Sequence, residues 1–246
     1  MHDKNYERYK HLGGVRDNIA SDFGITQGNI LDIATGDAFF AIAFAKRLQQ
    51  GKVIGIDNIK EHIKDAKQNI KELQDKCELQ VKNFFKNEFQ NESFDIITTF
   101  LGVCDLAKTQ EQLEKVFTEI KRLLKPKGRL LIAEATPEDA ENESQKIGFE
   151  IHQKFFYKYF SKEELKETLK GVGFKDITIS FYDTKQEKIS DNDLKEFLKD
   201  ESKFCEIDHN MAIDWKQIYE KYKDKIDNPG IEFDGKITVI TAAKTS

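Results

Sequence analysis

Short apolar runs and longer helical patterns alternate along most of the chain, an order typical of α/β proteins. Seven runs of mostly apolar or β-branched residues predict strands over 30–33, 52–56, 78–82, 94–100, 129–134, 177–181 and 236–243. Apolar residues at helical spacings predict helices over 3–23, 40–48, 59–73, 109–124, 161–174, 191–204 and 213–226. A glycine pair, Gly13-Gly14, is expected to interrupt the first of these helices.

The turn after the first strand is the part of the chain best suited to bind a ligand. Residues 29–38 have the sequence N-I-L-D-I-A-T-G-D-A, and three small residues in it allow close approach of the backbone: Ala34, Gly36 and Ala38. A dinucleotide site prefers G-x-G-x-x-G, and its third glycine falls on Phe39, where a ring obstructs strand–helix packing. The carboxylate of Asp32, inside the strand, suits a cationic amino group better than a phosphate.

Two polar residues follow the second and third predicted strands. Asp57 can accept hydrogen bonds from both hydroxyls of a ribose, which indicates a nucleoside without specifying which one. The same residue can cap the next helix, and the two roles are compatible. The amide of Asn83 can accept a hydrogen bond from an exocyclic amino group, although an asparagine in a turn is the simpler interpretation.

Residues 32–38, D-I-A-T-G-D-A, resemble motif I of the class I S-adenosylmethionine (SAM) methyltransferases. They are particularly similar to the D-V-A-T-G-T-G form of the ubiquinone/menaquinone C-methyltransferase-like group (methyltransferase type 11/25). Ala38 departs from that pattern, which has glycine at a position that we expect only needs to be small. The run 83–95, which ends in S-F-D, and the string L-L-K-P-K-G-R-L-L-I-A-E at 123–134 resemble later motifs of the family.

The resemblance implies a Rossmann-like α/β fold with seven mostly parallel strands and helices on both faces of the sheet. The last strand would run antiparallel beside the fifth, and a helical insertion would separate strands six and seven. The resemblance also implies SAM as the cofactor. The residues expected to bind it are Asp32, Ala34, Thr35, Gly36, Asp57, Asn58, Asn83, Phe84 and Phe100. In the family, the position of Asn83 binds the adenine amino group and the next backbone N–H reaches the ring.

Methyl transfer mainly requires alignment of the acceptor atom with an already electrophilic carbon. A base is needed only if the acceptor must lose a proton. Asp105, Glu134 and His152 are the candidates for that base, and Glu134 is equally suited to a structural role at a strand end. The loop 101–105 lacks the [DN]-P-P-[YF] motif, which argues against amino-directed methylation of DNA or of protein glutamine.

Composition narrows the choice of partner and compartment. A net charge of −5 with interleaved signs argues against a nucleic-acid substrate, since no basic face is evident. The 3 cysteines are scattered and the 5 histidines lack metal-ligand spacing, so we expect a reducing cytosol and no metal. The polar N-terminus and the lack of a long apolar run predict a soluble cytoplasmic protein without membrane contact, either a monomer or a homodimer.

We expect a single domain over 1–246, with two segments placed to control access to the ligand. Residues 1–28 would form either a helix packed on the edge of the sheet or, as the resemblance implies, an N-terminal helical flap over the cofactor, hinged at the glycine pair. Residues 183–234 form a helical insertion, which is a candidate lid; packing on the core and a subunit contact are the alternatives. The aromatic segment 139–160 is a second candidate for the acceptor side.

The sequence therefore predicts a SAM-dependent methyltransferase that acts on a small-molecule acceptor, whose identity no segment specifies. Three alternatives stay open: an RNA- or protein-modifying methyltransferase, a non-catalytic SAM-binding module and an NAD(P)-dependent oxidoreductase.

Overall fold

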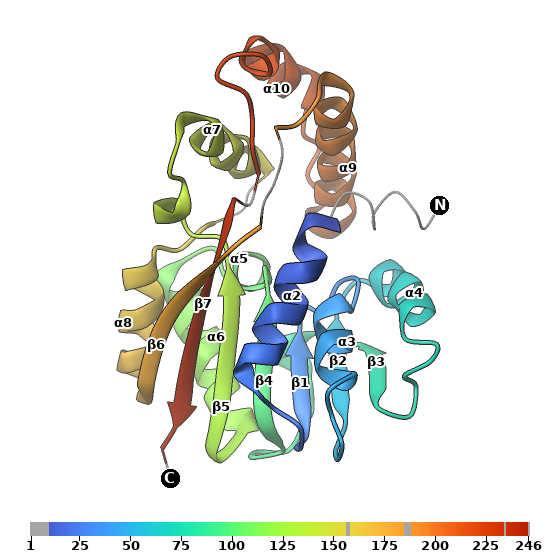
Figure 1. The fold of residues 1–246 in the computed structure, drawn as a ribbon, viewed down its shortest axis with the longest axis vertical. Helices are drawn as coiled ribbons and strands as arrows, with labels where there is room; N and C mark the ends of the chain where they lie inside the picture. The colour runs from blue at the N-terminus through green and yellow to red at the C-terminus, as the bar shows by residue number, and fades with distance from the viewer. Residues whose placement is uncertain (1–9, 156–157, 185–187, 234, 246) are drawn as a thin grey trace.

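A seven-stranded sheet forms the middle layer of the protein in a computed structural model that describes residues 10–155, 158–184, 188–233 and 235–245 (Figure 1). The strand order is β3-β2-β1-β4-β5-β7-β6. The strands are β1 (Ile30–Ile33), β2 (Val53–Asp57), β3 (Cys77–Val81), β4 (Phe94–Phe100), β5 (Leu124–Glu134), β6 (Phe174–Asp183) and β7 (Lys236–Lys244). The pairs among β1 to β5 are parallel, and β7 runs antiparallel to both β5 and β6. The predicted sheet and its antiparallel last strand are confirmed.

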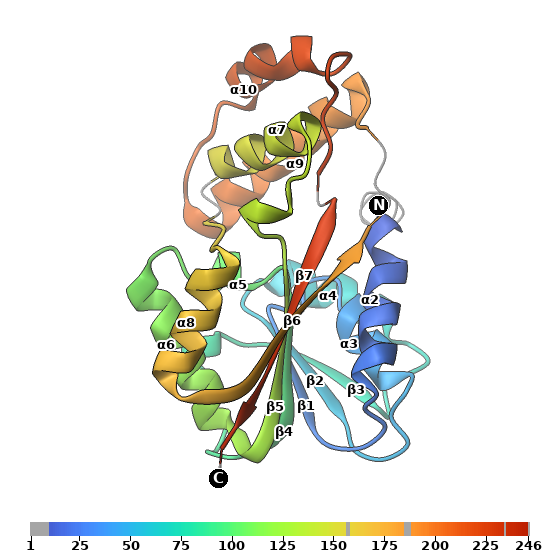
Figure 2. The ribbon, with the colours of Figure 1, turned by 60° about the vertical axis from the view of Figure 1, so that its left-hand side comes forward.

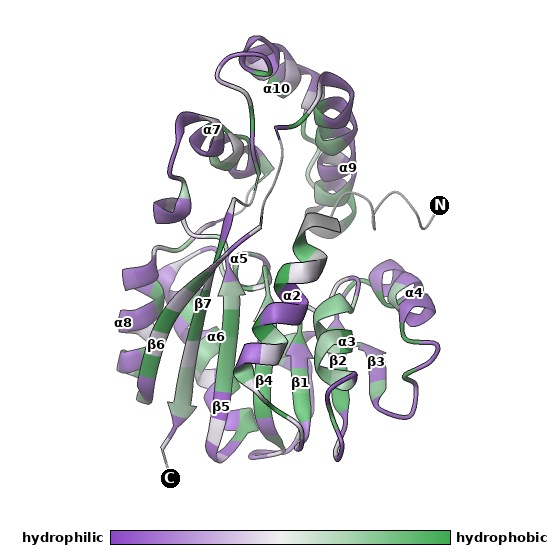
Figure 3. Ribbon diagram, viewed as in Figure 1, coloured by the Kyte–Doolittle hydropathy of each residue, from purple (hydrophilic) through white to green (hydrophobic). Residues whose placement is uncertain are grey.

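Helices cover both faces of the sheet (Figure 2). One face carries α2 (Lys10–Phe23), α3 (Phe39–Ala45) and α4 (Lys60–Asn69), and the other carries α6 (Gln110–Leu123) and α8 (Lys162–Val172). The short helices at the strand ends are η1 (Phe84–Lys86), α5 (Val103–Leu106) and η2 (Pro137–Asp139). The inner strands are largely hydrophobic where helices cover both faces of the sheet, whereas the start of β5 is polar (Figure 3).

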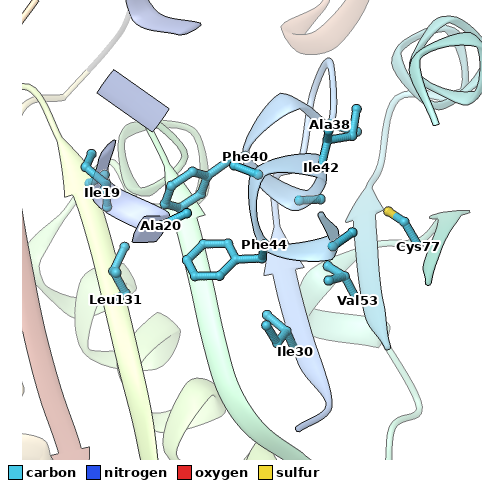
Figure 4. Packing of buried hydrophobic residues seen from close by; sticks show 14 of the residues in the cluster. Ile19, Ala20, Ile30, Ala38, Phe40, Ile42, Phe44, Val53, Cys77 and Leu131 are labelled. Atoms are coloured by element: carbon cyan, nitrogen blue, oxygen red, sulfur yellow. The ribbon is translucent and has the colours of Figure 1, made fainter. Parts of the chain in front are cut away.

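The helix after the first strand is buried beside α2 on one face of the sheet. Its sequence, F-F-A-I-A-F-A, is apolar all round, which is typical of a buried helix. Phe40 and Phe44 pack edge to face with ring centroids 5.1 Å apart and reach Ile19 and Ala20 of α2 (Figure 4). This packing holds the start of α3, and the turn before it, at one place on the sheet edge.

The expected interruption of the first helix at Gly13-Gly14 is wrong. The helix α2 runs without a break from Lys10 to Phe23 because its apolar residues are buried against α3 and the sheet: Leu12, Val15, Ile19 and Ala20. Its end is also tied to the sheet, since the hydroxyl of Tyr182 donates to Asp22 over 2.7 Å. This packing offsets the cost of two glycines in a helix, which is about 1 kcal/mol each. Residues 1–9 of the predicted flap lie outside the described residues.

Several element boundaries differ from the predicted ones, and β6 (Phe174–Asp183) is longer at both ends than the predicted 177–181. The strand β5 begins at Leu124, before the Lys125-Pro126-Lys127-Gly128 turn, because Leu124 pairs with Phe94 and a register shift between Phe94 and Ile96 takes up the extra residues. In the insertion, α9 (Asp191–His209) is longer than predicted, and α10 (Trp215–Tyr222) is shorter and passes into η4 (Lys223–Lys225).

A separate group of helices, here called the cap, lies beyond the carboxyl ends of the parallel strands (Figure 1). It consists of the described parts of 141–155 and 188–233, and includes α7 (Glu143–His152), η3 (Gln153–Phe155), α9, α10 and η4. The two segments share a hydrophobic core formed by Ile147, Ile151, Phe155, Leu194, Phe197, Leu198, Cys205, Tyr222, Ile231 and Phe233. The two segments that were predicted independently for the acceptor side therefore form one structural unit.

Among the described residues, the helices are too short or too polar to cross a membrane.

Candidate functional site

The turn between β1 and α3 has an unusual backbone. Ala34, Gly36 and Ala38 all have left-handed dihedrals, with φ of 53°, 49° and 63°. A Cβ at position 36 would meet no atom within 4 Å, so packing does not require glycine there. Glycine is favoured because of the left-handed dihedral, and it leaves open space beside the backbone. The expectation that position 38 only needs to be small is incomplete, because the left-handed conformation itself favours glycine there.

Asp57 lies at the end of β2 and holds this turn. One carboxylate oxygen accepts the Gly36 N–H over 3.0 Å and the other accepts the Ile59 N–H over 2.9 Å. The N-cap of α4 is Ile59, so Asp57 closes the turn before the helix instead of occupying the predicted cap position. Each oxygen keeps a lone pair for a ligand, because a carboxylate accepts about four hydrogen bonds. Asn58 follows it and is exposed.

Asp32 lies directly beneath the turn and is only 1% exposed. Its two oxygens accept hydrogen bonds from the hydroxyls of Thr35 and Thr98, both over 2.6 Å. Burial raises the pKa of Asp32 to about 6, and the two hydroxyls oppose that rise. The site therefore holds a carboxylate whose ionised form would gain from a nearby positive charge.

Arg16 of α2 is a feature of the site that periodicity did not predict. Its side chain is 9% exposed and its Nη1 lies 3.2 Å from Oδ2 of Asp37 in the turn. Its guanidinium carbon lies 4.7 Å from the ring centroid of Phe100, at the end of β4. Its Nε is buried without a hydrogen-bond partner among the described residues. An arginine among the buried apolar positions of a helix is the sequence signal that could have identified it.

The residues after β3 form the outer part of this edge. The Asn83 side chain is exposed, and its Oδ1 accepts the Phe85 N–H over 2.9 Å, which leaves a second lone pair. Phe84 is 4% exposed and packs in the core, so only its backbone is available to a ligand. Phe85 has the more accessible ring, at 49% exposure, and was not predicted.

The three candidate bases are in different environments. Asp105 is exposed on α5. Glu134 is buried and accepts the Val103 N–H over 2.7 Å, which ties the loop after β4 to the end of β5. The ring of His152 lies in the cap, 4.8 Å from that of Phe233. Glu134 thus has the structural contact expected at a strand end. The described residues hold no cluster of histidine, cysteine and acidic side chains that fits a metal ion.

Comparison with known proteins gives a consistent assignment. A family model described as a methyltransferase domain matches residues 26–226. Demethylmenaquinone methyltransferase of Lactiplantibacillus plantarum is 33% identical over 117 residues, which cover 46% of this chain and 48% of the relative. The enzyme of the same name from Lactobacillus johnsonii is 29% identical over 174 residues, covering 61% and 69%. The chain thus spans about half the length of the first of these relatives and more of the second.

Among solved structures, phosphoethanolamine N-methyltransferase 2 of Haemonchus contortus in complex with phosphomonomethylethanolamine and S-adenosylhomocysteine matches with a TM-score of 0.62. It is 22% identical, and the match covers 95% of this chain and 53% of that chain. This likeness shows the shared fold.

Proposed function

This chain belongs to the methyltransferase-domain family, and from that premise we propose that it is a SAM-dependent methyltransferase acting on a small-molecule acceptor. The observation that carries the proposal is the hydrogen bond between the Gly36 N–H and Asp57. This hydrogen bond connects the turn after β1, which suits the methionyl part of SAM, with Asp57, which suits its ribose.

The side chains at this edge fit the two ends of the cofactor. Asp57 would accept hydrogen bonds from the ribose hydroxyls, and Asn83 with the exposed ring of Phe85 would bind the adenine. Asp32 would stabilise the amino group of the methionyl moiety, and Arg16 would pair with its carboxylate. The buried Nε of Arg16 supports this role, because a carboxylate can accept a hydrogen bond from it.

When bound, SAM supplies an electrophilic methyl group, and the protein's contribution is alignment. Phe100 is the last residue of β4, and Leu101 begins the short loop that leads into α5. Leu101 has a left-handed φ of 53°, and its N–H donates to the carbonyl of Ala133 over 2.8 Å. The hydrogen bond from Val103 to Glu134 holds the same loop from its other side. These contacts would hold the loop rigid next to the acceptor.

The acceptor would bind between this edge and the cap. The relatives named above are called methyltransferases of demethylmenaquinone and of phosphoethanolamine, which are small molecules of different chemistry. We infer a small molecule here too, and the net charge of −5 favours it over RNA. Cys77, Cys104 and Cys205 are all buried and lie in different parts of the fold, which suits the cytoplasm that we expected.

The proposal is tested by incubating the protein with SAM labelled on its methyl group and a panel of acceptors. The panel contains a short-chain demethylmenaquinol, phosphoethanolamine, a sterol and total tRNA. We expect label on one of the small molecules and none with Asp57→Ala. Binding of SAM without transfer to any acceptor or to metabolite extracts would instead support a non-catalytic module.

A further inference from the structure

The cap contacts the cofactor edge through a pair of stacked rings. His62 of α4 and Phe204 of α9 have ring centroids 5.4 Å apart and an interplanar angle of 8°. His62 lies in α4, the helix that follows Asp57 in the α/β body of the protein, whereas Phe204 belongs to the insertion. Figure 1 shows α9 running from the top of the cap down toward α2 and α4.

The other side of His62 faces the proposed ribose acid. Its Nδ1 lies 3.5 Å from Oδ1 of Asp57, and its side chain is 32% exposed. The imidazole therefore stands between the carboxylate and the cap. Asp57 accepts one backbone N–H on each oxygen, and a ligand that uses the remaining lone pairs would further restrain the carboxylate next to His62.

Phe204 is fixed to the rest of the cap by its own helix. The next residue, Cys205, is fully buried, and its thiol contacts the carbonyl of Phe155 in η3 over 3.4 Å. Leu194 and Leu198 of α9 are also fully buried in the cap core. A change in the position of Phe204 is therefore transmitted to α9 and the cap core, because packed side chains transmit displacement.

We propose that His62 is a positioning residue that couples cofactor binding to the placement of the cap through its stack on Phe204. The inference rests on the proposed function, because it takes Asp57 as the ribose ligand. Cofactor binding restrains Asp57 and His62, and the stack then holds α9 over the acceptor space. Since coupling between two sites is reciprocal, an ordered cap also strengthens cofactor binding. A cap held in place by the bound cofactor would also favour binding of the acceptor.

Amide hydrogen exchange on the full chain, with and without S-adenosylhomocysteine, tests this coupling. Phe204→Leu removes the ring stack and keeps an apolar side chain, and His62→Phe keeps the ring but removes the nitrogen that faces Asp57. Phe149→Leu is the matched control, because it removes a ring contact of the cap with Tyr159 that does not involve α4. Circular dichroism and the melting temperature establish that each variant is folded.

We expect S-adenosylhomocysteine to slow exchange in 191–209 of the wild-type protein by about fivefold or more, within the usual range of coupling between sites. The effect should be lost in Phe204→Leu and His62→Phe and kept in Phe149→Leu. Because the coupling is reciprocal, the affinity for S-adenosylhomocysteine should fall by about the same factor in the two ring variants and stay unchanged in Phe149→Leu. Persistence of the slowing in both ring variants would overturn the coupling. So would ligand protection of 32–38 without any protection of α9 in the wild type, although the proposed function would then stand. If S-adenosylhomocysteine protects no segment, the proposed function fails and the coupling fails with it.

Discussion

Asp32 shows at the scale of a single residue how the site is kept at a cost in stability. Its pKa in the folded protein is about 6, against 3.8 for an ordinary aspartate, so the folded state binds a proton more tightly than the unfolded state does. The unfolding free energy therefore falls as the pH rises through that interval, and the full penalty of about 3 kcal/mol applies above pH 6. A cationic ligand would recover part of this cost by stabilising the ionised form.

Asp32→Asn should consequently stabilise the unliganded protein and weaken cofactor binding. We expect an unfolding free energy higher by about 1 to 3 kcal/mol at pH 8 and little difference at pH 4, where Asp32 is already protonated. Affinity for S-adenosylhomocysteine should fall about 10- to 100-fold. Urea unfolding at the two pH values measures the first effect and titration calorimetry the second. A variant less stable at pH 8 would show that Asp32 serves the fold and not the ligand.

Arg16 allows a test that separates the two ends of the cofactor. Arg16→Gln should lower the affinity for S-adenosylhomocysteine about 10- to 100-fold, since a charge-assisted hydrogen bond to the carboxylate is lost. The affinity for 5′-methylthioadenosine, which lacks that carboxylate, should not change. Arg47→Gln is the matched control, because Arg47 pairs with Asp17 of α2 and not with the turn. Equal losses of affinity for both ligands would show that Arg16 supports the packing of α2 and does not bind the carboxylate.

At this edge, the sequence predicted the site residues that lie at the ends of strands, because their position in the chain indicates their role. Asp32, Gly36 and Asp57 belong to this group, because parallel strands bring their carboxyl ends together. Arg16 could not be predicted in this way, since its place depends on how α2 packs on α3 and Phe100. The dihedral of Ala38 was missed for a similar reason: a small side chain fits many turns, and only the fold specifies the sign of φ.

At the scale of elements, strands and helices with strong periodicity were found, and their ends were found only where a local signal marks them. The helix 109–124 was predicted from its apolar face and its capping residue Thr109, whose side chain accepts the Gln112 N–H. β5 starts earlier than predicted, because a bulge lets a proline-containing segment pair with β4. The continuity of α2 was missed because glycine propensity was weighed without the packing that overrides it.

Because α2 is continuous, Gly14→Ala should stabilise the protein. Gly14 is exposed, and a Cβ there would meet no atom within 4 Å, so alanine adds helix propensity at no steric cost. We expect a gain of about 0.5 to 1 kcal/mol in the unfolding free energy, visible as a higher melting temperature. A loss of stability, or a loss of methyl transfer at unchanged stability, would instead support a hinge at the glycine pair.

At the scale of the whole molecule, the protein is an α/β body with a cap inserted at the edge that carries the site. The segment 183–234 was predicted as helical, whereas 139–160 was predicted only as an aromatic segment, so the helix α7 within it was missed. Their union was not predicted, because the shared core brings together residues that are distant in sequence, such as Ile147 and Ile151 of α7 and Leu194 and Leu198 of α9. Periodicity identifies an apolar face but not the face on which it packs.

The ends of the insertion lie together, since the N–H of Thr184 donates to the carbonyl of Gly235 over 3.2 Å. A short Gly/Ser linker in place of 185–232 should therefore leave the sheet intact. Ile151→Ser in the same variant limits the apolar surface that α7 would expose. We expect affinity for S-adenosylhomocysteine to fall only by the coupling to the cap, about 5- to 10-fold, and methyl transfer to be abolished. Retained transfer would refute the cap's role in acceptor binding, and joint loss of ligand binding and solubility would make the insertion part of the core or of a subunit interface.

The central claim, that this sheet edge is a SAM site, is tested most directly by isothermal titration calorimetry of the wild-type protein with S-adenosylhomocysteine and, separately, with NAD. The structure predicts saturable binding of one S-adenosylhomocysteine per chain, weakened by Asp57→Ala, and no heat from NAD. Binding of NAD with no response to S-adenosylhomocysteine would contradict the account.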